Sequence, residues 1–184
     1  MKWFKKHKVL SVILAFIVIA VIASAASGGS NNSSSGGNSN NAEKTYKFDD
    51  RADKQKKDVE VLPGETATVG GVKMTISNVE YKTHLSDFET ADSGKTYVVA
   101  DVALENTSNE TQPYNIFNFR IQTASGQVLD GAITTIQTLG SGDMVAGGKA
   151  SGKVVFEVPV EDGHNYVIWK PNGFNSDRAI VRVK

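Results

Sequence analysis

The residues best equipped for chemistry form an acidic group near the middle of the chain. Asp87, Glu89 and Asp92 lie close together, and His84 precedes them. Carboxylate oxygens gathered in one loop are the ligands that calcium and other hard cations prefer. The spacing departs from that of an EF-hand, because the twelfth position from Asp87 is Val98 rather than Glu. The three acids are therefore candidate metal ligands, with a solvated acidic loop as the alternative.

The sequence has no complete catalytic or nucleotide-binding motif. Gly94-Lys95-Thr96 resembles the end of a phosphate-binding loop, but Glu89 stands where that loop requires its first glycine. The chain has no Gly-x-Ser-x-Gly, Ser-x-x-Lys or His-Glu-x-x-His motif, and it has no cysteine. We therefore expect no enzyme and no cofactor. From Val59 onward there are ten basic and fifteen acidic residues, a balance that argues against binding nucleic acid.

The elements that must position these residues are strands. Apolar and polar residues alternate along several segments, as in strands with one face on a core. These segments are residues 72–77, 98–105, 117–122 and 153–158, followed by two shorter ones at 166–169 and 179–183. Glycine-containing turn pairs separate them, and no segment after residue 59 has a convincing helical period. The pattern predicts an all-β antiparallel sandwich, with a barrel as the alternative.

Two long segments without strand pattern are the places to look for a binding surface. They run from Thr83 to Gly94 and from Asp130 to Val145. Loops of this length in a compact domain are commonly functional. Aromatic residues that could anchor a partner, or equally pack in the core, lie elsewhere in the folded part. They are Tyr97, Tyr114, Tyr166, Trp169 and Phe174.

The N-terminus predicts export. A basic segment, residues 1–8, precedes an apolar run at 9–26 that as a helix would be about 27 Å long. This is close to the hydrocarbon thickness, and lysines on one flank favour a cytoplasmic N-terminus. Ala23-Ser24-Ala25 also fits a signal-peptidase site, so cleavage near Ala25 and secretion is the alternative. We favour a single-pass membrane anchor with an extracellular C-terminal domain.

Residues 27–58 are expected to be a disordered linker. Residues 27–41 are only Gly, Ser and Asn, a composition typical of a flexible tether. Residues 42–58 carry dense charges of both signs, with Tyr46 and Phe48 as a weak apolar pair. This pattern is typical of a solvated spacer, although a recognition peptide is the other interpretation. The sandwich domain is expected at residues 59–184.

The folded part resembles a known bacterial family. The stretches that carry the resemblance occur in the same order as in that family: residues 69–76, 86–88, 94–102, 105–110, 119–121 and 147–159. They are similar to domain of unknown function 4352, an extracellular domain common in Gram-positive bacteria. The resemblance implies an immunoglobulin-like, telokin-like β-sandwich preceded by one apolar helix or a lipoprotein signal. It implies no chemical activity.

Together these observations predict an exported, membrane-tethered interaction module. Its partner would be a protein, a peptide or a component of the cell envelope, and its contact with the membrane would run through residues 9–26. The alternatives are a structural or stress-related envelope protein without a discrete ligand, and a metal-binding or hydrolytic domain. Fold alone does not choose among them.

Overall fold

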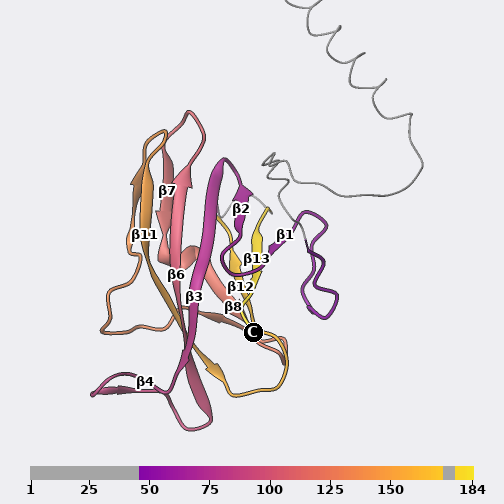
Figure 1. Cartoon of the computed structure of the whole chain (residues 1–184), viewed down its shortest axis with the longest axis vertical. Coiled ribbons are helices and arrows are strands. Elements are labelled where there is room, and N and C mark those ends of the chain that lie inside the picture. Colours follow the sequence, from indigo (N-terminus) through magenta and orange to yellow (C-terminus); the bar gives the residue numbers. More distant parts are fainter. Residues whose placement is uncertain (1–45, 172–176) are drawn as a thin grey trace, which may run out of the picture. The chain divides into compact units, whose positions relative to one another are not determined.

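The structure is a computed structural model that describes residues 46–171 and 177–184 (Figure 1). The basic segment, the apolar run and the linker up to residue 45 lie outside the described residues. Within the described ranges, no helix has the length and hydropathy of a membrane span. The chain divides after Asn40, and residues 41–184 form one compact unit.

Two open sheets make up this unit. The first has the order β1-β13-β12-β8-β9 and the second the order β11-β6-β3-β2. The strands of the first are β1 (Val59–Val61), β13 (Ala179–Arg182), β12 (Tyr166–Trp169), β8 (Phe119–Gln122) and β9 (Val128–Asp130). Those of the second are β11 (Lys149–Pro159), β6 (Lys95–Asn106), β3 (Val72–Lys82) and β2 (Thr66–Val69). Neither sheet closes on itself, so the predicted sandwich is confirmed and the barrel is not formed.

Smaller elements join these sheets. A two-stranded sheet pairs β7 (Gln112–Asn115) with β10 (Ser141–Met144), and a hairpin pairs β4 (His84–Ser86) with β5 (Glu89–Thr90). A short 3-10 helix, η1 (Ile116–Asn118), leads into β8. Every strand pair of the described residues is antiparallel except β1 with β13, which run parallel. At that edge the antiparallel prediction is wrong, because β1 joins the first sheet before the chain crosses to β2 in the second.

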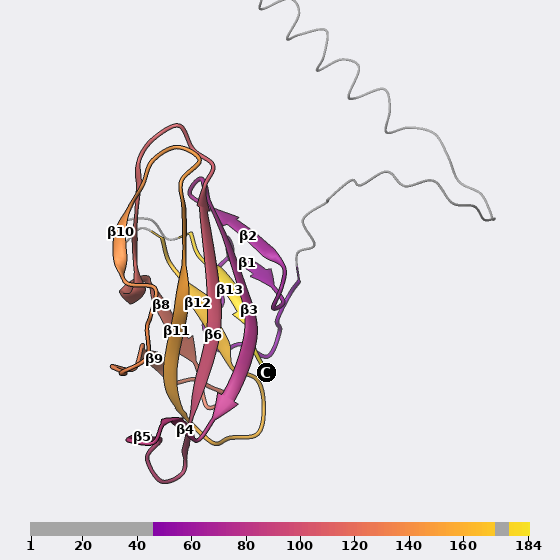
Figure 2. The ribbon, with the colours of Figure 1, turned by 60° about the vertical axis from the view of Figure 1, so that its left-hand side comes forward.

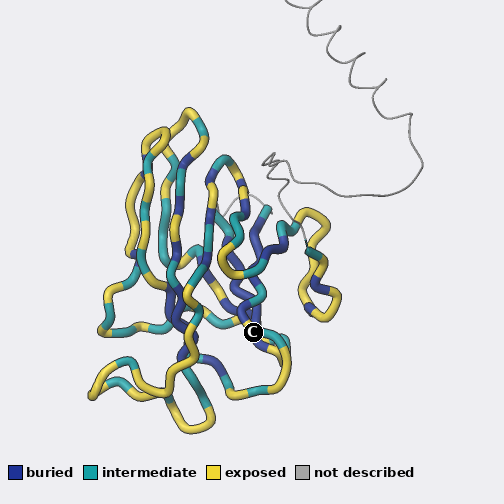
Figure 3. Tube along the Cα trace, viewed as in Figure 1, coloured by how far each residue is buried: buried dark blue, intermediate teal, exposed yellow. Residues whose placement is uncertain are grey.

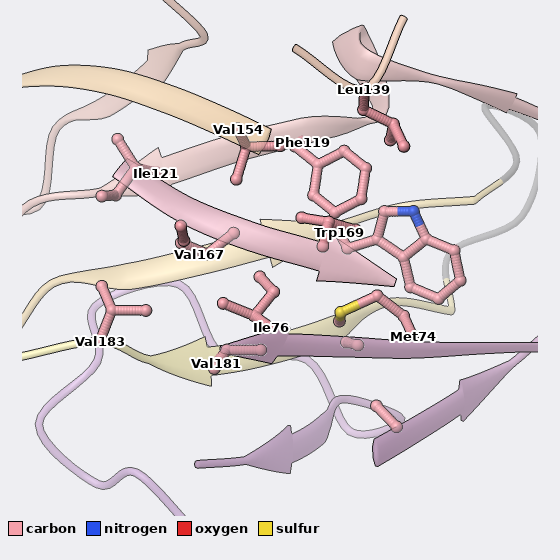
Figure 4. Packing of buried hydrophobic residues seen from close by; sticks show 14 of the residues in the cluster. Met74, Ile76, Phe119, Ile121, Leu139, Val154, Val167, Trp169, Val181 and Val183 are labelled. Carbon is pink, nitrogen blue, oxygen red and sulfur yellow. The ribbon is translucent and has the colours of Figure 1, made fainter. Parts of the chain in front are cut away.

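The core lies between the two sheets and follows the predicted alternation (Figure 4). Met74 and Ile76 of β3 are fully buried, whereas Lys73, which directly precedes Met74, is exposed. Phe119 and Trp169 stack with their ring centroids 6.1 Å apart, which fills the centre of the cluster. Burying such side chains contributes about 1.5–3 kcal/mol each, so this layer is the main source of stability.

The folded unit begins earlier than the sequence suggests. Residues 46–58, here called the N-terminal strap, lie against the outer face of the first sheet rather than forming a solvated spacer. The backbone N–H of Tyr46 donates to Glu60 O at 3.0 Å, extending the sheet edge beyond β1. Phe48 is 3% exposed and packs with Tyr166, Ile168 and Ile180. The linker boundary predicted at Asp58 is therefore corrected to a point before Tyr46.

Buried ion pairs hold the strap in place. Asp58, with a side chain 3% exposed, accepts from the guanidinium groups of both Arg51 and Arg178, the latter at 2.7 Å. Arg51 also pairs with Glu60 at 2.9 Å, and Arg178 pairs with Asp53 at 2.7 Å. Burial disfavours the Asp58 carboxylate, but hydrogen bonds from Arg178, the Gln55 N–H and Arg51 outweigh it and lower the pKa of Asp58. Two charges of the strap, those of Arg51 and Asp58, are thus buried, whereas its other charged residues lie at the surface.

Replacing Asp58 with Asn should destabilise the protein in a pH-dependent way. We expect a loss of about 2 kcal/mol in the free energy of unfolding at pH 7, because two buried guanidinium groups lose a shared anion. The folded pKa of Asp58 is lowered, so the wild-type advantage is present above the unfolded value of about 3.9 and disappears as pH falls through the folded value. Urea denaturation of both proteins across this range measures the difference.

The matched control for this prediction is Asp49→Asn. Asp49 pairs with Lys54 in the same strap, but its side chain is 88% exposed. Exposed pairs contribute little to stability, so this variant should unfold like the wild type at every pH. Equal effects of the two substitutions would contradict the burial of the ion cluster.

Candidate functional site

The first long segment predicted as a loop, and residues 131–139 of the second, lie together on the outer face of the second sheet. The predicted segments also contain short strands, β4 and β5 in the first and β10 in the second. Tyr97, Val99 and Val155 point away from the central core, yet each is buried. The covering side chains come from the two segments: Leu85 and Ala91 from the first, Ala132 and Ile136 from the second. Residues 83–94 and 131–139, here called the loop layer, therefore form a small second core at one end of the sandwich.

Hydrogen bonds fix the loop layer to the sheet. The backbone N–H of Ala132 donates to Val155 O at 2.8 Å, and that of Leu139 donates to Lys153 O at 3.0 Å. A glycine permits this approach, because a Cβ at Gly152 would lie 2.4 Å from the Cα of Leu139. The free edge of β11 is thus partly paired, and the second segment is held along it.

Glu89 joins the two halves of the layer. Its Oε2 accepts from both the backbone N–H of Thr135 at 3.0 Å and the hydroxyl of Thr135 at 2.6 Å. The backbone N–H of Asp92 donates to Glu157 on β11 at 2.7 Å, which anchors the end of the hairpin. The carboxylates of Glu89 and Glu157 therefore position the loops.

The candidate metal ligands do not converge. Glu89 is bonded to Thr135, Asp92 pairs with Lys95 at 2.8 Å, and Asp87 is exposed in the turn between β4 and β5. The hydrogen bond that Lys95 donates to the Asp92 carboxylate raises the pKa of Lys95. His84 Nδ1 lies 2.8 Å from the hydroxyl of Thr90. Across the part of the chain that the structure describes, His, Asp and Glu side chains nowhere gather in threes as a metal site would require.

The most exposed large apolar side chains of the loop layer are at its tips. Phe88 is 99% exposed in the β4–β5 turn, and Ile133 is 101% exposed in the second segment. The Glu89–Thr135 bonds hold these two segments side by side, and Figure 3 shows the β4–β5 hairpin as a largely exposed segment. Val160, 68% exposed, is next to this region because its N–H donates to Gly94 O. Such exposed apolar groups on a fixed frame suit contact with a partner.

The aromatic residues considered as interface anchors are mostly buried. Tyr97, Tyr166 and Trp169, considered as interface aromatics, are all buried, and Tyr114 is half-buried. Phe174 lies outside the described residues. Phe88 and Ile133 were missed, because nothing in their local sequence separates an exposed loop residue from one that folds back on the sheet.

Comparisons with solved structures identify the fold. The YjhA protein of Bacillus subtilis is 18% identical over 67% of this chain and 99% of its own, with a TM-score of 0.55. A proposed lipoprotein of Bacillus subtilis, YcdA, is 12% identical over 65% of this chain and 38% of its own, with a TM-score of 0.54. The secreted protein MPT63 of Mycobacterium tuberculosis is 15% identical over 70% of this chain and 99% of its own, with a TM-score of 0.51.

At these identities the likeness is one of fold. None of the curated proteins compared with the sequence matches it significantly. The family comparison is more specific, because the model of a domain of unknown function, DUF4352, matches residues 61–179. This range contains the whole second sheet, the loop layer and three strands of the first sheet, β8, β9 and β12, but only one residue each of β1 and β13. It confirms the resemblance found in the sequence. The chain therefore belongs to the DUF4352 family.

Proposed function

We propose that the protein is an exported, membrane-tethered binding module with an immunoglobulin-like sandwich, and that it has no catalytic role. Its binding surface is the end of the sandwich formed by the loop layer, and its partner is a protein or peptide of the cell envelope. The observation that carries the proposal is the pair of fully exposed side chains, Phe88 and Ile133, on two segments tied together through Glu89.

A rigid support distinguishes this surface from a loose loop. The layer has its own buried residues and is bonded to β11 at two backbone positions. Exposing Phe88 and Ile133 on such a frame gives a partner apolar anchors at a small cost in conformational entropy. Hot spots of protein interfaces have this composition, with an apolar centre and a polar surround. Asp87 and Thr135 supply polar groups beside the two tips.

Export and tethering are supported by the order of the N-terminal residues. Four lysines, an apolar run of eighteen residues and a Gly/Ser/Asn tract follow one another before the folded unit begins. A proposed lipoprotein and a secreted protein share the fold. A tether fits a domain that stays attached to the membrane and searches for its partner within reach of the linker.

Replacing both tips, Phe88→Ala with Ile133→Ala, should remove binding without affecting folding. We expect immobilised residues 41–184 to retain an envelope protein or peptide that the double variant retains at least about tenfold less, because apolar anchors dominate such contacts. The wild type and the double variant should unfold at the same denaturant concentration, since neither replaced side chain is buried. Quantitative mass spectrometry of the retained material gives the ratio.

The matched control is Val145→Ala. Val145 is 66% exposed, but it lies just after β10, away from the loop layer. This variant should retain the same material as the wild type. Identical profiles from the wild type and the double variant would refute the loop layer as the binding surface.

The full-length protein should fractionate with the cell membrane. We expect it to resist extraction by salt and to dissolve in detergent, because the apolar run is long enough to span the hydrocarbon core. Recovery from the growth medium with an N-terminus at Ala26 would instead establish cleavage and secretion. Immunoblotting of the fractions and N-terminal sequencing decide between these outcomes.

A further inference from the structure

A groove of about 540 Å³ lies on the outer face of the first sheet, beside the strap. Asp53 and Gln55 of the strap line one part of it, and η1 lines another. Ile168 of β12 and Val128 of β9 are its apolar contributors from the sheet. In Figure 2, β8, β9 and β12 lie next to one another in the layer that carries this groove. Its volume falls in the range of sites for small molecules.

The strand register brings basic groups to one part of the groove. Ile168 of β12 is paired with Arg120 of β8, and the backbone N–H of Lys170 donates to Asn118 O at 3.0 Å. Residues two apart on a strand point to the same face, so Lys170 lies on the same outer face as Arg120. Arg178 also lines the groove.

The lining is cationic. Arg120, Lys170 and Arg178 are its basic residues, and Asp53 is its acidic one. Asp53 pairs with Arg178 at 2.7 Å, and Asp130 on β9 pairs with Arg120 at 2.8 Å. Lys170 differs from both arginines, because it is half-buried and has no ion pair or side-chain hydrogen bond among the described residues. The positive charge of Lys170 is therefore not neutralised by an acidic side chain of the described residues.

An exposed aromatic ring stands beside these cations. Phe117 of η1 lines the groove and is 79% exposed. Asn115 caps the 3-10 turn by accepting from the Phe117 N–H at 2.9 Å, so the backbone that carries the ring is fixed. A ring held at the rim of a cationic groove can stack on a planar group of a ligand.

We propose that this groove binds a small anionic ligand that joins a phosphate or carboxylate to a planar apolar group. Lys170 and Arg120 hold the anion, and Phe117 stacks on the planar part. The strap completes the site through Asp53 and Gln55, although the family model begins only at residue 61. The site is separate from the loop layer, which lies on the other sheet. Either binding proposal can therefore be refuted without affecting the other.

Titration with phenyl phosphate tests the proposal. The probe is added to residues 41–184, the compact unit that contains the buried clusters of the described ranges, and backbone amide shifts are followed by NMR. We expect saturable shifts at residues 117–120, 128 and 168–170. Lys170→Gln should weaken binding about fivefold or more, because it removes a charge-assisted hydrogen bond. Raising the salt concentration should weaken it as well.

Two further variants make the result specific. Lys73→Gln is the matched control, since Lys73 is exposed on the outer face of the other sheet and has no ion-pair partner in the described ranges. It should leave the affinity within about twofold of the wild type. Phe117→Ala should weaken phenyl phosphate but not inorganic phosphate, because only the first carries a ring.

Three outcomes would overturn the proposal. The groove amides could remain unshifted at millimolar phenyl phosphate. Lys73→Gln could weaken binding as much as Lys170→Gln, which would indicate unspecific attraction to surface lysines. Phe117→Ala could leave phenyl phosphate unaffected, which would remove the planar part of the ligand from the proposal. Unfolding of each variant in urea shows whether the fold is retained.

Discussion

Burial of alternate side chains between the two sheets is the constraint on which the rest of the structure depends. Met74, Ile76, Phe119 and Trp169 can fill the core only if every second residue of their strands faces inward. A shift of one residue in any strand would expose its apolar set. The same alternation fixes which residues face outward, and so it determines what the outer faces can carry.

Both outer faces then gain an additional layer from segments outside the main sheets. The strap packs Phe48 on the first sheet and locks it there through Arg178, which is 125 residues away from Asp53 in sequence. The loop layer packs on Tyr97, Val99 and Val155 of the second sheet. Each layer leaves part of its face open. Beside the strap lies the cationic groove, and at the end of the loop layer lie the exposed tips.

The sequence predicts the strands because their signal is local. Alternation at residues 72–77 and 98–105 reflects contact with a single core, and it is visible in one window. The packing of the strap on the sheet cannot be predicted in this way, since its partners Arg178 and Ile180 lie far along the chain. Its charges also resemble those of a solvated spacer. For the acidic group the sequence predicts a site that the structure does not form. Glu89 and Asp92 look like ligands in sequence, but the fold gives them Thr135 and Lys95 as partners.

Amide hydrogen exchange of residues 41–184 tests most directly whether both layers are part of the folded unit. We predict slow exchange at Tyr46, which donates to Glu60 O, and at Leu139, which donates to Lys153 O. Their protection should persist until the strands beside them open. Exchange at the rates of an unstructured chain at either position would contradict it, since that layer would then be detached from its sheet.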